Sequence, residues 1–485
     1  PTALALFNLC CFLAPEGIPL ALLRDHAAAL PPELAAAAAD DLALDAAITP
    51  LRAYALAARD GDALAVHRLV QTVARDRLPP QLAQQWAEAA TNLLRAAWPF
   101  DQHNMETWPA ATALLPHLLA ALAVTQEINL ETERVASLHN KVAFYLHQVG
   151  QYKLAHTHIQ RALAIDKKAL GPDHPTVATR LNNLGTLLQD MGDLGGARPY
   201  YDRALAIWER VLGPDHPQVA TGNNNLGTLL QAMGDLGGAR PYLDRALAIL
   251  EKALGPDHPD VAAGNNNLGG LLYAMGDLGG ARPYLDRALA IRQKSLGPDH
   301  PDVAQSLNNL GMLLQNMGDL GGARPYLDRA LAIWEKALGP DHPGVATDLN
   351  NLGLLLKATG DLGGAREPLD RALVIREKAL GPDHPDVAQS FNNLGTLLQA
   401  TGDLAGARPY LDRALAIFEK NLGSDHPNVA TLNNNLGMLL QDMGDLGGAR
   451  EHLQRALAIA EDRLGPNHPN TQTFRRNLAG VARQI

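Results

Sequence analysis

The 485-residue sequence has little cysteine and few aromatic residues. Its two cysteines, Cys10 and Cys11, are adjacent, and neighbouring cysteines rarely bridge each other. This argues against a disulfide framework, and we interpret both as buried thiols on an apolar helix in a reducing, cytoplasmic compartment. Aromatic residues make up 5% of the chain and hydrophobic residues 47%. A core of leucine and alanine favours helices, so we expect an all-α fold.

Long basic runs and long apolar runs are also missing. The formal net charge of −10 argues against nucleic acid or an anionic membrane as the main partner. No apolar run reaches the roughly 18 residues that span a bilayer, so we expect no membrane-spanning helix. The apolar segment 3–14 lacks the basic flank of a signal peptide. Because the sequence begins at Pro1 without Met, we interpret it as a fragment of a longer protein.

A phosphate-binding loop of the type G-x-x-x-x-G-K-[ST] is missing as well, since Gly-Lys occurs nowhere in the sequence. In such a loop the glycine-rich backbone and the lysine hold the phosphates of a nucleotide. The recurring stretch GDLGGAR is glycine-rich, but it lies at a turn between helices and has no lysine. We find no catalytic constellation either, and we therefore expect no catalytic residues, no cofactor and no enzymatic activity in this chain.

What the sequence does contain is a repeat of 42 residues, and residues 302–343 show one copy of it. Leucines at helical spacing predict a first helix over 303–317. Gly318 ends this helix, and Asp319 supplies an N-cap carboxylate for a second helix that runs to about Leu338. Each repeat is therefore expected to be a helical hairpin.

This repeat resembles the tetratricopeptide repeat. The family's pattern of a large residue, Leu-Gly, a turn glycine, and then alanine, an aromatic residue and alanine falls on Leu307, Leu310, Gly311, Gly318, Ala323, Tyr326 and Ala330. The usual repeat has about 34 residues, and the longer repeat here, with its linker LGPDHP, resembles those of kinesin light chains. We expect eight repeats over 134–469 and a capping helix at 470–485. The resemblance implies a superhelix with the first helices along its concave side.

One histidine recurs in the linker GPDHP and its variants GSDHP and GPNHP. The set is His174, His216, His258, His300, His342, His384, His426 and His468. The residue before a proline favours extended backbone, and proline suits the first position of a helix, so each histidine is expected at a helix entrance. A zinc site needs three or four ligands around one ion, and no cysteine, second histidine or glutamate stands nearby in sequence. We therefore interpret the histidines as structural and expect no metal.

Pairs of asparagines in the first helices are the candidate ligand-binding residues. Leucines beside them must face the core, which turns the second asparagine of each pair toward the concave face. An amide offers a donor and an acceptor, so it can pair with the backbone of an extended peptide whatever its side chains are. This face carries few Lys or Arg, Lys357 being an exception, so capture of a terminal carboxylate is not expected. The alternative is that the amides bond to neighbouring helices and hold the repeats in register.

The candidate set has three parts. The second asparagines are Asn183, Asn225, Asn267, Asn309, Asn351, Asn393 and Asn435. The first asparagines are Asn182, Asn224, Asn266, Asn308, Asn350, Asn392 and Asn434. The outward residues one to two turns later are Gln189, Gln231, Tyr273 and Gln315.

Residues 1–80 have a different pattern. Apolar helical segments over 3–14, 18–29 and 32–47 precede Asp60-Gly61, a hairpin signal between two short strands. Helices followed by a hairpin and another helix suggest a winged helix. Its six basic and nine acidic residues give it a net charge of the wrong sign for DNA phosphates.

This segment resembles the winged helix that closes the nucleotide-binding module of STAND ATPases of the NB-ARC type. The stretch AVHRLVQ (65–71) matches the Met-His-Asp position of that family, with Arg68 in place of Asp. The resemblance implies that His67 senses the nucleotide state in the full-length protein, where ATP or ADP is expected. The alternative is that His67 only anchors the hairpin to the helix that follows it. Residues 81–133, divided by Pro109 and Pro116, are expected to be a helical connector made of short pieces.

The sequence therefore predicts the sensor part of a bacterial STAND ATPase. The repeats would bind a protein or peptide in the concave groove, and the winged helix would relay that event to an NTPase domain absent from this chain, with ligand-induced oligomers of the full-length protein. Two alternatives stay open: a freestanding scaffold of the kinesin-light-chain type, and a repeat-regulated transcription factor whose winged helix binds DNA.

Overall fold

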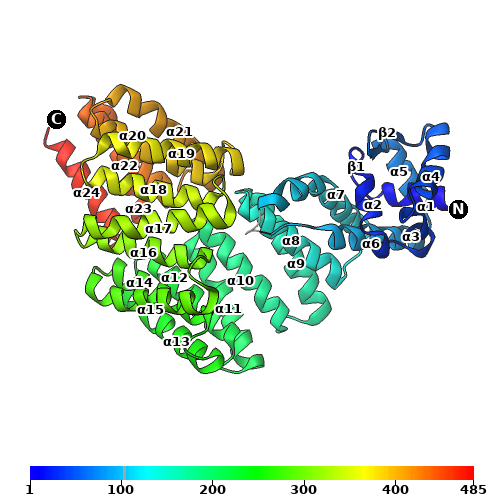
Figure 1. Cartoon of the computed structure of the whole chain (residues 1–485), viewed down its shortest axis with the longest axis horizontal. Helices are drawn as coiled ribbons and strands as arrows, with labels where there is room; N and C mark the ends of the chain where they lie inside the picture. The colour runs from blue at the N-terminus through cyan, green and yellow to red at the C-terminus, as the bar shows by residue number, and fades with distance from the viewer. Residues whose placement is uncertain (102–104, 485) are drawn as a thin grey trace. The chain divides into compact units, whose positions relative to one another are not determined.

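The computed structural model describes residues 1–101 and 105–484 of the chain (Figure 1). Residues 102–104, within the expected connector, and residue 485, at the end of the expected capping helix, lie outside the described residues. The chain forms two compact bodies. The first comprises Pro1–Gln148 with Lys153–Pro172, and the second comprises Val149–Tyr152 with Asp173–Ile485.

The first body is mainly helical and contains one small sheet. Its elements are α1 (Thr2–Cys10), β1 (Ile18–Pro19), α2 (Leu20–Arg24), η1 (Ala27–Ala29), α3 (Pro32–Ala38), α4 (Asp41–Ala53), β2 (Ala58–Asp60), β3 (Ala63–Ala65), α5 (Arg68–Arg77), α6 (Pro80–Ala97), η2 (Met105–Thr107), α7 (Trp108–Glu127), α8 (Glu133–Gln148) and α9 (Tyr152–Leu170). Cys10 and Cys11 are free and buried, as expected, and burial raises the pKa of both thiols to about 12.

The sheet contains the hairpin that Asp60-Gly61 predicts. β2 and β3 pair antiparallel on either side of Gly61, whose φ of 56° suits glycine. β1 adds to the other edge of β3, which gives the strand order β1-β3-β2. Ile18 opposes Leu64 in this pairing, and both are buried, so the sheet packs one face against the helices.

The predictions of two helices in this body are wrong in detail. The segment 18–29 is not one helix but β1, α2 and η1, because its start pairs with β3. The segment 32–47 divides into α3 and α4, since Asp40 caps α4 by accepting a hydrogen bond from the backbone N–H of Leu42 at 3.1 Å.

The prolines of the connector do not break it into short pieces, so that expectation is also wrong. α7 is a continuous 20-residue helix with Pro109 in its first turn and Pro116 inside it. Pro109 stands where a helix N–H has no intrahelical partner, so its missing donor costs little. At Pro116 one helical hydrogen bond is lost, but the flanking turns bury Ala111, Leu118 and Ala121 completely or nearly so.

α7 also meets the length and composition of a membrane-spanning helix, which the search for apolar runs in the sequence missed. Within the first body it packs as a core helix. The ring of His117 is buried and accepts a hydrogen bond from the backbone N–H of Ala14 at 3.2 Å. Its other nitrogen lies 3.1 Å from the carbonyl oxygen of Gly17. Burial lowers the pKa of His117, which keeps the ring neutral for these two bonds.

The second body is a stack of helical hairpins with a final single helix, and consecutive hairpins lie side by side (Figure 1). Its helices are α10 (Pro175–Asp190), α11 (Leu194–Leu212), α12 (Pro217–Ala232), α13 (Leu236–Leu254), α14 (Pro259–Ala274), α15 (Leu278–Leu296), α16 (Pro301–Asn316), α17 (Leu320–Leu338), α18 (Pro343–Ala358), α19 (Leu362–Leu380), α20 (Pro385–Ala400), α21 (Leu404–Leu422), α22 (Pro427–Asp442), α23 (Leu446–Arg463) and α24 (Pro469–Ala482). The two helices expected in this repeat, one over 303–317 and one that Asp319 caps and that runs to about Leu338, correspond to α16 and α17.

Each hairpin closes through the glycine of its Leu-Gly pair. A Cβ on Gly311 of α16 would lie 2.7 Å from Cδ2 of Leu327 and 3.4 Å from the carbonyl oxygen of Ala323, both on α17. Only a residue without a side chain allows this close approach of the two helices. Ala323 and Leu327 are fully buried as a result, so the glycine is required by packing and not by a turn.

Four of the five residues of the linker GPDHP have a structural role, as the linker before α16 shows. Gly297 ends α15 at a φ of 90°, and Asp299 pairs with Lys336 and Arg329 of the following hairpin. Nδ1 of His300 accepts a hydrogen bond from the backbone N–H of Asp302 at 3.1 Å, and Pro301 takes the first helical position. The same histidine cap begins α10, α12, α14, α18, α20, α22 and α24. The prediction that each histidine stands at a helix entrance is confirmed.

Asp348 is a buried carboxyl group at a position where four other repeats of the second body have small residues. These are Gly222, Gly264, Ser306 and Ser390, whereas the remaining two repeats have Arg180 and Leu432. Asp348 is 2% exposed, and within the described part of the chain its Oδ2 atom has no hydrogen-bond partner. Burial raises the pKa of this carboxyl from 3.8 to about 8, so the folded protein holds it protonated at neutral pH.

Changing Asp348→Ser should therefore stabilise the protein in a pH-dependent way. Between pH 4 and 8 the folded state binds one more proton at Asp348 than the unfolded state, so stability falls with rising pH by up to about 1.4 kcal/mol per unit. Because serine does not titrate in this range, the stability of the variant does not fall with pH at this position. Urea midpoints measured at pH 5 and pH 8 should show a clearly larger advantage of the variant at pH 8. An equal advantage at both values would contradict the shifted pKa.

Candidate ligand-binding groove

The asparagine pairs of the first helices form a ladder between repeats. Nδ2 of each second asparagine donates to Oδ1 of the first asparagine of the preceding repeat, at 2.5 to 2.9 Å. The donors and their acceptors are Asn225 to Asn182, Asn267 to Asn224, Asn309 to Asn266, Asn351 to Asn308, Asn393 to Asn350, Asn435 to Asn392, and Asn477 to Asn434. Of the predicted set, Asn183 lies half-buried on α10.

The last rung was missed by the sequence analysis. Asn477 belongs to α24, whose stretch RRNLAG departs from the NNLG of the repeats, so only the final Asn-Leu pair marks the register. The ladder agrees with the interpretation that the amides hold neighbouring repeats in register. It does not use up their capacity, because a side-chain amide has two N–H donors and an oxygen acceptor. Their role in ligand binding stays a prediction.

The outward residues that follow the asparagines differ in their surroundings. Gln189 accepts a hydrogen bond from the buried Tyr201 hydroxyl at 3.3 Å, and Nε2 of Gln231 lies 3.5 Å from the carbonyl oxygen of Gly270. The oxygen of Gln315 is buried and has no hydrogen-bond partner within the described residues. At the equivalent position, Nζ of Lys357 donates to the carbonyl oxygen of Thr396 at 3.0 Å, and burial lowers its pKa.

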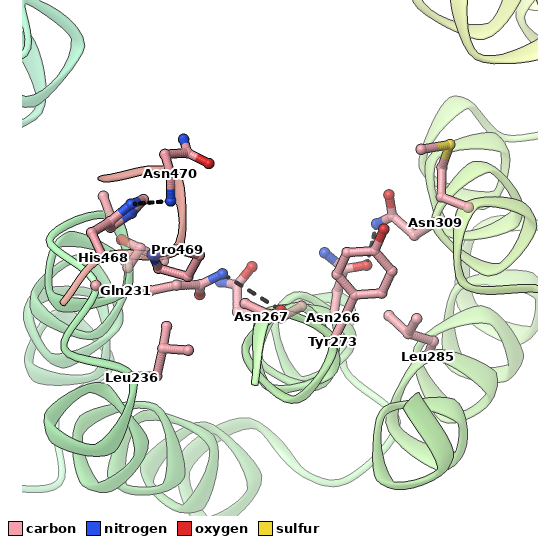
Figure 2. A pocket seen from close by; sticks show the side chains of 16 residues that line it. Gln231, Leu236, Asn266, Asn267, Tyr273, Leu285, Asn309, His468, Pro469 and Asn470 are labelled. Atoms are coloured by element: carbon pink, nitrogen blue, oxygen red, sulfur yellow. Dashed lines mark hydrogen bonds between the residues drawn. The ribbon is translucent and has the colours of Figure 1, made fainter. Parts of the chain in front are cut away.

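A pocket with a volume of about 680 Å³ opens along three successive first helices, α12, α14 and α16 (Figure 2). It brings together five residues of the predicted set, namely Gln231, Asn266, Asn267, Tyr273 and Asn309. The remaining predicted residues do not line it. Its volume lies within the range of about 300–1,000 Å³ that is typical of ligand pockets.

The opposite side of this pocket is formed by the start of α24, with His468, Pro469 and Asn470 (Figure 2). These residues were missed by the sequence analysis, and no sequence signal could have found them. They follow the α14 residues by about two hundred positions, and only the winding of the superhelix brings the two segments together.

That winding places the turn glycines of early repeats against the histidine caps of late ones. A Cβ on Gly192 would lie 2.2 Å from Cδ2 of His426, and one on Gly234 would lie 2.8 Å from Cδ2 of His468. The ring of His426 also hydrogen-bonds the backbone of Asp190. Burial lowers the pKa of His426 to about 4, so the ring stays neutral. A Cβ on Gly150 would likewise lie 2.8 Å from Cδ2 of His384. Three of the eight histidines, His384, His426 and His468, therefore have a second role, in contacts between superhelical turns.

The first body holds the remaining predicted site residue, His67. It is exposed and caps α5, with Nδ1 accepting a hydrogen bond from the backbone N–H of Leu69 at 3.2 Å. An acceptor at Nδ1 fixes the neutral ring in the tautomer that carries its hydrogen on Nε2. Among the described residues, no group of three or more His, Cys, Asp or Glu side chains is arranged to hold a metal ion.

A stack of helical hairpins that line one groove is typical of superhelical α-repeat proteins. The family model named Tetratricopeptide repeat matches this chain in overlapping segments at 134–198, 177–252, 218–294, 260–321, 302–378, 358–420, 386–462 and 428–485. These matches cover well over half of the chain, and the chain belongs to the tetratricopeptide repeat family. A second model, Domain of unknown function (DUF7779), matches residues 1–83.

One solved structure shows the same fold. The signal transduction ATPase with numerous domains (STAND) protein with a tetratricopeptide repeat sensor from Pyrococcus horikoshii is 14% identical, with a TM-score of 0.52, over 98% of this chain and 65% of that one. At this identity the likeness shows the fold alone. A putative kinesin light chain with nearly identical repeats from Podosopora anserina is 28% identical over 42% of this chain and 97% of that one, with a TM-score of 0.35.

A nucleotide-binding leucine-rich repeat (NLR)-like protein of Hyaloscypha variabilis is 31% identical over 140 residues, which are 28% of this chain. The match spans only 14% of the length of that relative, so what the whole relative does is not carried over.

The contact between superhelical turns can be separated from backbone strain. Gly192 and Gly318 are equivalent turn residues with φ of 77° and 83°, and a Cβ on Gly318 meets no described atom within 4 Å. Changing either to Ala adds a similar backbone cost of about 1 kcal/mol. Only Gly192→Ala also clashes with His426, so it should lower the melting temperature further and increase the radius of gyration measured by X-ray scattering. Equal changes in melting temperature and radius of gyration for Gly192→Ala and Gly318→Ala would contradict the contact between Gly192 and His426.

Proposed function

We propose that this chain is the ligand-sensing part of a STAND-type signalling ATPase and that its groove binds an extended protein segment or peptide. The observation that carries the proposal is the pocket in which amide side chains of three successive first helices converge. The chain's membership of a protein-binding repeat family supports the proposal, and so does the local similarity to an NLR-like relative.

The first body would relay the binding event to a nucleotide-binding domain outside this chain. His67 suits contact with a phosphate, because its cap to Leu69 leaves an exposed Nε2–H donor. α5, which follows His67, is anchored to α1: Gln71 donates to the carbonyl oxygen of Cys10 at 2.9 Å, and Arg75 donates to that of Cys11 at 2.7 Å. A displacement at His67 would therefore reach the core of the first body.

ATP or ADP would be held by that other domain and not by this chain. The sequence has no Gly-Lys pair, so it cannot form a lysine-containing phosphate loop. We therefore propose no nucleotide hydrolysis by this chain and derive no step through a nucleotide. We further propose a cytoplasmic location and ligand-induced oligomers of the full-length protein.

A freestanding scaffold is the second candidate, favoured by the kinesin-light-chain-like length of the repeats. The coding sequence upstream of Pro1 distinguishes the two, since only a STAND protein has a phosphate-binding loop there. DNA binding by residues 1–80 is less well supported. Arg24 is paired with Asp62 at 2.7 Å and Arg59 with Asp45 at 2.6 Å, which neutralises arginines that a phosphate backbone would need.

Changing Asn267, Asn309 and Asn351 to Ala together tests the groove. The probe is a phage-displayed library of random 12-residue peptides, selected on the full chain, followed by titration of the best synthetic peptide. We expect at least tenfold weaker binding by the variant. The melting temperature should fall only modestly, because each rung contributes about 1 kcal/mol and alanine returns about half of that as helix propensity.

The control is Gln305→Ala, which changes an exposed residue of α16 away from the pocket and should leave binding unchanged. Undiminished binding by the folded triple variant would assign the amides to repeat register alone. Binding of double-stranded DNA by the full chain that weakens steeply with salt would instead support the transcription-factor alternative.

A further inference from the structure

In an array of near-identical repeats, a residue that departs from its equivalents carries more information than one that is copied. The repeat that begins with α14 has two such departures within one helix. Gly270 stands where the first helices of the other hairpins in the second body have Thr186, Thr228, Met312, Leu354, Thr396 and Met438, and the final single helix α24 has Gly480. Tyr273 stands where they have Gln189, Gln231, Gln315, Lys357, Gln399 and Gln441. Both residues line the 680 Å³ pocket.

Gly270 is not required by packing. A Cβ on it would meet no described atom within 4 Å, whereas one on the neighbouring Gly269 would lie 2.7 Å from Cδ2 of Leu285. Gly270 has no positive φ and lies inside a helix, where glycine is a poor helix former. The residue therefore weakens α14 without a compensating contact in the chain. The missing side chain of Gly270 leaves space beside the Tyr273 ring.

The walls around this space are uncharged. No Lys, Arg, Asp or Glu is among the described residues that line the pocket. Its polar groups are the amides of Gln231, Asn266, Asn267, Asn309 and Asn470, the hydroxyls of Thr228 and Tyr273, and the ring of His468, and its apolar groups include Leu236, Leu285, Met312 and Pro469. Nδ1 of His468 accepts a hydrogen bond from the backbone N–H of Asn470 at 3.1 Å, and burial lowers the pKa of this ring. Among the described residues, such a surface has no Lys or Arg to neutralise a phosphate or a carboxylate, so it fits a neutral ligand with hydrogen-bonding groups and an apolar part.

The amides favour a peptide backbone as the source of those hydrogen-bonding groups. Asn266, Asn267 and Asn309 lie on two adjacent helices, and Asn309 donates to Asn266 at 2.6 Å, so they form one continuous strip (Figure 2). An extended peptide offers alternating N–H and C=O groups along such a strip. His468 and Asn470 close the strip from the other side.

We propose that the pocket at α14 is the specificity pocket of the groove, and that it takes one large apolar or aromatic side chain of an uncharged, extended peptide. That side chain lies over Gly270 and against the Tyr273 ring, and the adjoining backbone bonds to Asn267 and Asn309. This inference rests on the proposed function of the groove and adds where the groove selects its ligand and for what chemistry.

The test is Gly270→Met, which introduces the side chain present at the equivalent positions 312 and 438. The probes are two synthetic libraries of eight-residue peptides with blocked ends, offered to the full chain. One library has only uncharged residues, including Leu, Phe, Tyr and Trp. The other has a glutamate or a phosphoserine at every peptide's centre. Bound peptides are identified by mass spectrometry, and the best one is titrated.

The wild-type chain should select the uncharged library, with one aromatic or large apolar residue in a fixed position. Gly270→Met should bind the selected peptide at least tenfold more weakly, while its melting temperature stays equal or rises. Tyr273→Gln should weaken binding in the same direction. The control Gly279→Ala changes another helical glycine with open space around it, outside the pocket, and should leave binding unchanged.

Two results would overturn the inference. One is selection of the charged library. The other is equal affinity of the wild type and Gly270→Met for the selected peptide. If Gly270→Met binds normally but the triple asparagine variant does not, the groove binds peptides and only the specificity pocket is refuted. If neither library binds, and the random peptides do not either, the proposed function fails together with this inference.

Discussion

The second body depends on one constraint: no hairpin can bury its apolar face alone. Val261 and Ala262 of α14, and Ala281 of the following α15, are fully buried only because a hairpin stacks on each side. The distance between the two helices of each hairpin is set by glycine, since Gly269 brings α14 onto α15 with no room for a Cβ. Leucine and alanine fill the remaining space, which explains how an array with so few aromatic residues folds. Each added repeat then continues the same rotation, so the winding of the superhelix follows from contacts between neighbours.

The linker makes this rotation reproducible. Its histidine caps the next helix in every repeat of the second body, and its aspartate pairs with a basic residue of the hairpin that follows, as Asp257 does with Lys294 at 2.5 Å. Exposed ion pairs of this kind contribute little to stability singly, but they fix the angle at which one hairpin follows another. After several repeats the accumulated rotation brings late repeats of the second body against early ones, and His426 meets Gly192. The linker histidine, which only caps a helix in some repeats, thus also makes a long-range contact in others.

Sequence reasoning worked where the physics is local. Helix ends in the repeats could be placed to within about two residues, because a glycine with positive φ, an aspartate cap and a proline each act on their own turn. It failed where packing decides, as at Pro116, which lies inside an intact helix, and at 18–29, where pairing with β3 replaces a helix. The candidate site shows the same division. The asparagine pairs were recognisable from their spacing, but their mutual bonds and the approach of Asn470 depend on how repeats stack and wind.

The duplication that made the fold easy to recognise also hides its site. A residue present in every copy, such as the second asparagine, serves the ladder wherever it occurs, so its repetition cannot locate one binding position. Positions at which one repeat differs from the others can locate a binding position. α14 carries a glycine that opens space without serving packing and a tyrosine where an amide is usual. It lies where the first helices face the start of α24 across the groove. In a repeat protein the shared residues build the scaffold, and the departures from them, placed where the superhelix closes on itself, are where ligand selectivity is best sought.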